Sequence, residues 1–406
     1  MQIFTKRLVA CLLCLTLCWL SATVYSQGIW TKKKDKPGNA THEMGAFGIN
    51  GKGYVCGGVI AYPNGSNETW EYNPTTDTWA QKANFPVTSM REPAFFVING
   101  KGYAGTGMTG TSIVNTFYEF DPVANTWTAK ANFGGTARRD AVGFAINGKG
   151  YMGTGVDAAG GTKDIWEYNP TGNTWTKKTD FGGVIRNAAI AFAIGNKGYI
   201  TTGRQGTPTY NDCWEYDPTG NAWTQKSNYG GTTRSECISF VINGKGYVGL
   251  GHTGTGGPTD FWSFDPVANA WGTVTAFPGT GTERFESVGF EIGNKGYICG
   301  GIIQGLGTQI DLWEYDPQAV GVNEQAAELN FSIYPNPSTG KFIISSAHPI
   351  SSLQVYDLQG KKVYWEAHPT NNSPIELSGN PSGVYLLQVK SEDGNLSGTR
   401  KIILNR

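Results

Sequence analysis

The sequence predicts an all-β chain, in which repeated four-stranded units form a β-propeller and a smaller β domain follows. Three observations carry this prediction. The 406 residues include 57 glycines without a three-residue period, which indicates many tight turns between short strands. The segment FGINGKGYVCGG at 47–58 recurs in similar form five more times, and its Gly-Tyr pairs are 48 to 50 residues apart. From residue 331 onward this repeat stops and another strand pattern begins.

Each repeat supplies four short strands. The first two flank Asn-Gly or Gly-Asn, as at Asn50-Gly51, and this pair supplies the positive φ of a tight hairpin turn. The segment TWEYNPTTDTWAQK at 69–82 adds two more strands, which its Asn-Pro pair separates. Such a sheet is apolar on both faces and must stack on its neighbours, as a propeller blade does. Six blades are predicted, one for each Gly-Tyr pair: Gly53, Gly102, Gly150, Gly198, Gly246 and Gly296.

The last repeat lacks the second tryptophan that the other repeats contain. Trp79 precedes the next Gly-Tyr pair by 23 residues, and Trp30 stands at the same distance before Gly53. The strand around Trp30 is therefore expected to complete the last blade and close a propeller that spans residues 27–318. A disulfide between Cys56 and Cys299 would require the first and last repeats to be neighbours.

The repeats resemble those of kelch proteins over about Gln27 to Pro317. Paired glycines follow the second strand, as in CGG at 56–58 and 299–301, and aromatic residues recur in WEYNP and NTW. This resemblance implies a six-bladed kelch-type propeller. It does not define an activity, because kelch propellers include both enzymes and binding platforms.

The N-terminus predicts a signal peptide over residues 1–26. Lys6 and Arg7 precede an apolar run at 8–20, and small or slim residues then stand at the positions that a signal peptidase reads. The run is too short for a membrane span, so no transmembrane span is expected in the mature chain. A linker is expected over 319–330.

Residues 331–406 are expected to form a small β-sandwich. The tail contains VYDLQGKKV at 355–363 and RKIIL at 400–404, and it resembles the C-terminal sorting domain of the type IX (Por) secretion system of Bacteroidetes. The resemblance implies export by that machinery and removal of the tail, with the body then extracellular or anchored on the outer-membrane surface. Its motif residues here are Tyr334, Pro335, Asn336, Pro337, Gly340, Gly383 and Tyr385.

Several function classes are excluded by composition and motifs. Lys plus Arg and Asp plus Glu both number 32, so a nucleic-acid partner is not expected. A copper oxidase of the galactose oxidase kind needs clustered His and Tyr ligands, but the propeller contains only His42 and His252. The Asp-box of sialidases does not occur. No cofactor and no metal are expected, because the remaining cysteines lack ligand spacing and fit small core positions: Cys56, Cys213, Cys237 and Cys299.

Charged residues recur at the start of the innermost strand. Ten residues before Gly-Tyr an acid is present in every repeat except the fourth, which has Ala188: Glu43, Glu92, Asp140, Glu236 and Glu286. Twelve residues before Gly-Tyr, the last four repeats have an arginine: Arg138, Arg186, Arg234 and Arg284. In the first two repeats, His42 and Arg91 stand one residue later. Alternate strand residues share a face, so the sequence predicts a ring of alternating arginine and carboxylate around the channel mouth.

Two interpretations of this ring stay open. A polar funnel could hold a carboxylated or hydroxylated sugar, while an inter-blade ion-pair network, the favoured interpretation, would be purely structural. Other acids, two residues before the third-strand aromatic, are expected to bond local backbone rather than calcium: Glu68, Asp164, Asp212, Asp260 and Asp311.

The functional prediction is a secreted or surface-bound binding module for a glycan or a surface protein, without chemistry of its own. The alternative is a sugar-modifying enzyme that resembles the periplasmic kelch sialate epimerase or a mutarotase. Glu236 with Arg234 or Arg284 would then supply acid/base catalysis and carboxylate binding.

Overall fold

The computed structural model describes residues 28–62, 64–254, 257–278, 284–319, 331–346, 348–370, 372–392 and 397–405. The chain divides into two compact units, one up to residue 319 and one from residue 320. All described regular structure is β-strand, which confirms the all-β prediction. The predicted signal peptide and residues 320–330 of the predicted linker lie outside the described residues.

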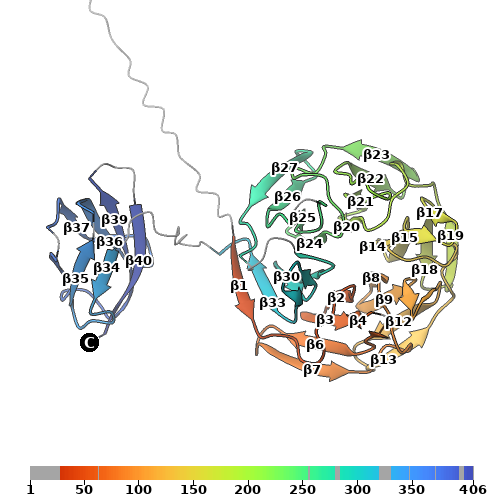
Figure 1. Cartoon of the computed structure of the whole chain (residues 1–406), viewed down its shortest axis with the longest axis horizontal. Helices are drawn as coiled ribbons and strands as arrows, with labels where there is room; N and C mark the ends of the chain where they lie inside the picture. The colour runs from red at the N-terminus through yellow and green to blue at the C-terminus, as the bar shows by residue number, and fades with distance from the viewer. Residues whose placement is uncertain are drawn as a thin grey trace, which may run out of the picture. The chain divides into compact units, whose positions relative to one another are not determined.

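The described part of the first unit contains six four-stranded antiparallel sheets. Figure 1 shows them around a common centre, with strands such as β2, β8, β14, β20 and β24 innermost. The first three sheets consist of β2 (Gly45–Ile49), β3 (Lys52–Cys56), β6 (Thr69–Asn73) and β7 (Thr78–Lys82); β8 (Ala94–Ile98), β9 (Lys101–Gly105), β12 (Phe117–Asp121) and β13 (Thr126–Ala129); and β14 (Val142–Ile146), β15 (Lys149–Gly153), β18 (Ile165–Asn169) and β19 (Thr174–Lys177).

The other three sheets repeat this order of strands, and the last one takes its fourth strand from the N-terminus. They consist of β20 (Ile190–Ile194), β21 (Lys197–Thr201), β22 (Cys213–Asp217) and β23 (Ala222–Lys226); β24 (Ile238–Ile242), β25 (Lys245–Gly249), β26 (Phe261–Asp265) and β27 (Ala270–Val274); and β29 (Val288–Ile292), β30 (Lys295–Cys299), β33 (Leu312–Asp316) and β1 (Ile29–Lys33).

Short strands accompany these sheets, and all of them except β28, which precedes β29, lie between a second and a third strand. They are β4 (Val59–Ala61) with β5 (Asn64–Gly65), β10 (Met108–Thr109) with β11 (Ser112–Ile113), β16 (Val156–Asp157) with β17 (Gly160–Gly161), and β28 (Arg284–Phe285) with β31 (Ile302–Ile303) and β32 (Gly307–Thr308).

The first and last sheets meet at a seam. β1 pairs with β33 and sets Trp30 opposite Tyr315, and the amide of Glu43 donates to the carbonyl oxygen of Glu286 at 3.1 Å. Although the first and last repeats are neighbours, Cys56 and Cys299 do not form a disulfide. Both thiols are buried as small core groups, and burial raises the pKa of each to about 12.

The glycine of each Gly-Tyr pair allows neighbouring sheets to approach closely. A Cβ added at Gly150 would lie 2.2 Å from the Phe96 ring of the preceding sheet, and one at Gly53 would lie 2.2 Å from Phe290 across the seam. The indole of Trp127 also donates to the carbonyl oxygen of Ala83 in the preceding repeat at 3.2 Å. Both faces of each sheet are therefore buried by stacking.

The second unit contains two antiparallel sheets. The first has the order β34 (Phe331–Tyr334), β35 (Lys341–Ser346), β38 (Pro374–Glu376), and the second has the order β37 (Lys362–Ala367), β36 (Ile350–Tyr356), β39 (Gly383–Ser391), β40 (Ser397–Leu404). Both sheets contribute side chains to one apolar cluster.

Two residues of the predicted sorting motif make specific contacts in this unit. The side-chain amide of Asn336 donates to the Lys401 carbonyl oxygen at 2.9 Å, and its Oδ1 accepts from the Ile403 amide at 2.9 Å. The Tyr385 hydroxyl donates to the carbonyl oxygen of Pro381 at 2.6 Å. The YPNP segment is thereby tied to the last strand.

Candidate binding site at the channel mouth

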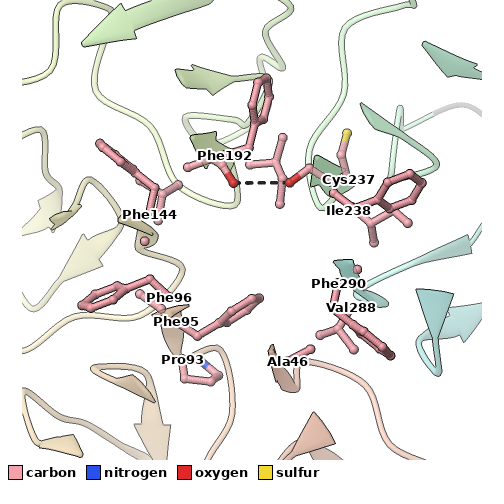
Figure 2. Close-up of a pocket in the computed structure, with 18 of the residues that line it drawn as sticks. Ala46, Pro93, Phe95, Phe96, Phe144, Phe192, Cys237, Ile238, Val288 and Phe290 are labelled. Atoms are coloured by element: carbon pink, nitrogen blue, oxygen red, sulfur yellow. Dashed lines mark hydrogen bonds between the residues drawn. The ribbon is translucent and has the colours of Figure 1, made fainter. Parts of the chain in front are cut away.

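A cavity of about 370 Å³ lies where the innermost strands of the six sheets converge. Its walls come from β2, β8, β14, β20, β24 and β29 and the residues just before them. In Figure 2 the ring of Phe95 points into the opening, whereas Phe144 and Phe192 point away from it. The Ser239 hydroxyl donates to the Ala191 carbonyl oxygen at 3.3 Å and links two neighbouring walls. The channel wall is thus mainly apolar below its mouth.

Five predicted acids line this same cavity, just before the innermost strands: Glu43, Glu92, Asp140, Glu236 and Glu286. All five have a φ between 54° and 58°, and Ala188 in the fourth repeat has 49°. Backbone hydrogen bonds join several of these positions from sheet to sheet, for example from the Glu92 amide to the Glu43 carbonyl oxygen at 3.0 Å. Because alanine shares the left-handed conformation, the fold sets this backbone whatever the side chain.

The four arginines predicted to alternate with these acids do not do so. Arg138 is buried, and its Nη1 and Nη2 contact Oδ1 and Oδ2 of Asp164 at 2.7 and 2.9 Å. A buried guanidinium needs a charged partner, and the bidentate carboxylate of its own repeat provides one. The same pair recurs in the next three repeats: Arg186 with Asp212, Arg234 with Asp260, and Arg284 with Asp311. The prediction that these four arginines alternate with the acids around the channel mouth is therefore wrong.

The prediction for these aspartates is corrected by the same contacts. Asp164 was expected to bond local backbone, but it accepts from Arg138 and from the Trp166 indole at 2.6 Å. Burial alone would raise its pKa, yet these hydrogen bonds hold the pKa of Asp164 below its ordinary value. The sequence contained a signal for this pair, because the second repeat has other residues at both positions, Met90 and Thr116.

Two arginines that the prediction did not include reach the acids instead. Arg139 contacts Glu92 at 3.2 Å and Asp140 at 3.1 Å, and Arg204 contacts Glu236 at 2.8 Å. Arg204 follows the second strand, at a position that holds other residues in the remaining repeats: Val59, Met108, Val156, His252 and Ile302. This departure of the fourth repeat from the others was the feature of the sequence that could have identified Arg204 as a site residue.

Arg91, a predicted site residue, is buried beside the mouth. Its Nη2 donates to the Gly110 carbonyl oxygen at 3.3 Å, and its guanidinium lies 4.8 Å from the Tyr62 ring centroid. Its charge opposes the rise in the pKa of Glu43. It thus neutralises part of the acidic ring without forming an ion pair with it among the described residues.

Three of the five acids have a raised pKa, and the charges of neighbouring acids contribute to each rise. Burial first, and then the charges of Glu92 and Glu286, raise the pKa of Glu43 to about 9. Burial and Glu92 raise the pKa of Asp140 to about 7, and burial and Glu286 raise that of Glu236 to about 7 against the effect of Arg204. Near neutral pH these groups can therefore both donate and accept protons.

Comparisons with known proteins agree with this architecture. Residues 40–86 match the family described as Kelch motif, and residues 332–405 match the secretion system C-terminal sorting domain. A solved structure titled "Structure of YjhT" is 16% identical, with a TM-score of 0.60, and the alignment covers 69% of this chain and 95% of that one. No curated protein matches. In all, 453 chains of solved structures match, so the fold does not define an activity.

The chain thus has a β-propeller fold with a kelch motif at residues 40–86, and it carries a secretion system C-terminal sorting domain. The sorting tail indicates export by the type IX secretion system, so the protein is secreted or associated with the cell surface. Among the described residues, no helix is long and apolar enough to cross a membrane.

Proposed function

We propose that this chain is an exported binding module whose ligand site is the acid-lined mouth of the propeller channel. One observation carries the proposal: five carboxylates surround the mouth of a single cavity, which Glu291 also lines, and the arginines around them in the described part of the chain are Arg91, Arg139 and Arg204. Carboxyl groups accept hydrogen bonds from hydroxyls, and protonated ones also donate. The mouth therefore suits a neutral, hydroxyl-rich ligand, and a glycan has this chemistry.

The proposed architecture is a signal peptide over 1–26, a six-bladed propeller over 27–318, a linker over 319–330 and a β-sandwich sorting domain over 331–406. The six described sheets, the pairing of β1 with β33 and the shared apolar cluster of the tail support it. In this proposal a Bacteroidetes type IX machinery exports the chain, and the body is released or held on the outer-membrane surface.

A thermal-shift screen of the full chain against neutral and acidic sugars tests the binding function. A ligand at a hundred times its dissociation constant stabilises by about 2.7 kcal/mol, which the screen detects. We expect a shift with a neutral sugar that disappears in Glu236→Gln and persists in Asp217→Asn, a partly exposed acid outside the cavity. Absence of a shift with every sugar would refute the glycan site and direct the search to surface proteins.

A second candidate function is acid/base conversion of a sugar, as an epimerase or mutarotase performs it. Asp140 and Glu236 flank the gap left by Ala188, and the pKa of each is raised to about 7. Arg204 pairs with Glu236 and also opposes the rise in the pKa of Asp140. A proton donor and a proton acceptor with pKa values near neutral are what such a reaction needs.

Proton NMR of anomerically enriched sugars distinguishes the two functions. An enzyme would accelerate equilibration of the anomers or epimers, and Asp140→Asn and Glu236→Gln would each remove this acceleration. Binding without acceleration would leave the chain a binding module.

A further inference from the structure

We propose that His42, Glu43 and Glu286 form a binding site for a divalent transition-metal ion at the seam between the first and last sheets. The donor atoms of these three side chains lie within 4.8 Å of one another. The proposal departs from the sequence-based expectation that the chain has no metal site. It is independent of the proposed ligand, because the ion is tested alone.

The repeat itself provides the comparison that points to a cation. Arg139 stands one residue before Asp140 and contacts both Asp140 and the acid of the preceding repeat, Glu92. His42 stands in the equivalent place before Glu43, and its Nδ1 lies 2.8 Å from Glu286 and 3.8 Å from Glu43. At this seam an imidazole thus replaces a permanently charged guanidinium between two carboxylates.

The polar atoms at this seam are not satisfied by hydrogen bonds. Oε2 of Glu43 and Nδ1 of His42 are shielded from solvent and have no hydrogen-bond partner among the described residues. The 2.8 Å contact between His42 Nδ1 and Glu286 is therefore not a well-formed hydrogen bond. Buried polar atoms without partners are costly, and coordination of an ion would satisfy both.

The fold holds the three residues in place. The backbone of His42 is bridged to Val59 in both directions, at 3.3 and 2.8 Å, and the amide of Glu43 donates to the Glu286 carbonyl oxygen. Ligand atoms about 2.0 to 2.2 Å from a shared ion lie up to about 4 Å apart, so a small side-chain rotation completes the set. Glu43 and Glu286 also line the cavity, which leaves further coordination positions open toward it.

The donor set favours a first-row transition ion. Imidazole with two carboxylates suits Zn²⁺ or Mn²⁺, whereas Ca²⁺ prefers six to eight oxygen ligands. The surplus of carboxylates over arginines around the mouth adds a general attraction for a divalent cation.

Titration of the metal-free, tag-free full chain with ZnCl₂ and MnCl₂ tests the proposal, with calorimetry for stoichiometry and the electron paramagnetic resonance of free Mn²⁺ as a second readout. We expect one ion per chain. His42→Gln and Glu286→Gln should each weaken binding by about tenfold or more, and Asp217→Asn, at an acid outside the cavity, should retain it.

Melting of each variant without metal shows whether it is folded, and if His42→Gln does not fold, Glu286→Gln carries the same test. The proposal is overturned if the wild-type chain binds neither ion stoichiometrically, or if binding survives both ligand variants. A chain that binds metal but no sugar would contradict only the proposed function.

Discussion

Glu236 connects the charge of the channel mouth to the stability of the fold. Burial and the charge of Glu286 raise its pKa from 4.5 to about 7, so the folded chain holds this proton more tightly than the unfolded chain. The resulting contribution to stability is complete below about pH 4.5 and is lost as the pH rises through about 7. We expect the free energy of unfolding to fall between pH 5 and pH 8, by on the order of 2–3 kcal/mol from this group.

Urea unfolding of the full chain at several pH values, followed by tryptophan fluorescence, measures this effect. Glu236→Gln should show a smaller fall in stability with pH than the wild type, because its side chain does not titrate. Asp217→Asn serves as the control, since hydrogen bonds from Lys197 and backbone amides lower the pKa of that partly exposed acid. Equal pH slopes for Glu236→Gln and the wild type would contradict the prediction.

We expect Arg186 and Asp212 to stabilise the fold only when both side chains are present. Arg186 is fully buried, and its guanidinium forms two hydrogen bonds to Asp212 at 2.7 and 2.8 Å. Arg186→Met leaves a largely buried carboxylate without its partner, so we expect a loss of about 3–5 kcal/mol in unfolding free energy.

The second repeat suggests how this loss can be reversed. It has Met90 and Thr116 at the two equivalent positions. The double variant Arg186→Met with Asp212→Thr should therefore be more stable than Arg186→Met alone, and a double-mutant cycle by urea unfolding gives the coupling. Purely additive losses would show that the two side chains do not act as a pair.

The acids of the candidate site could be found in the sequence, but the partners of the arginines could not. Counting along the repeat placed Glu43, Glu92 and the other acids at one end of the innermost strands, because that end has the same backbone in each repeat. The count gives the face of a strand, not the direction of a long side chain. Arg138 therefore reaches a carboxylate 26 residues later in the chain, and Arg139 takes the place at the mouth.

At the scale of the strands, the Gly-Tyr glycine should be essential for stacking. The Cβ of Gly150→Ala would overlap the Phe96 ring in the neighbouring sheet, so we expect a loss of about 1–3 kcal/mol in unfolding free energy. Gly272→Ala in β27 is a matched control, because the nearest atom to an added Cβ there is Ser263 Oγ at 3.9 Å. Urea unfolding that shows equal effects for both variants would contradict this account.

This close approach explains why the fold class was predictable from sequence. Each sheet must fit the next one, so the same residue types recur at the same places: glycine where a neighbouring phenylalanine packs, as at Gly150, and tryptophan where an indole meets the neighbouring backbone, as at Trp127. The mouth lacks this constraint, because its side chains face space rather than a neighbouring sheet. The basic residues at the mouth therefore differ from repeat to repeat, as Arg139 and Arg204 do, although the acids recur in five of the six repeats.

At the scale of the whole molecule, the contacts of Trp30 should hold the ring closed. Its indole donates to the Thr275 carbonyl oxygen at 3.0 Å and packs against Phe261, Phe277 and Tyr315. Trp30→Ala removes a large buried side chain from these contacts, so we expect a loss of about 3–5 kcal/mol in unfolding free energy. Trp365→Ala is the control, because Trp365 is 59% exposed.

If β1 closes the propeller, Trp30→Ala should change hydrogen exchange at the seam between the first and last sheets, which a local packing defect would not do. β1 covers the outer edge of β33, and the sheet that they share also contains β29. Glu286, two residues before β29, accepts a hydrogen bond from the Glu43 amide across the seam. Loosening of β1 should therefore lower hydrogen-exchange protection in β33 first and then at the Glu43 amide, while β14 and β15, which share another sheet, retain their protection. A uniform loss of protection in every sheet would show that the propeller opens as one cooperative unit, and unchanged protection at the seam would show that β1 is not what closes it.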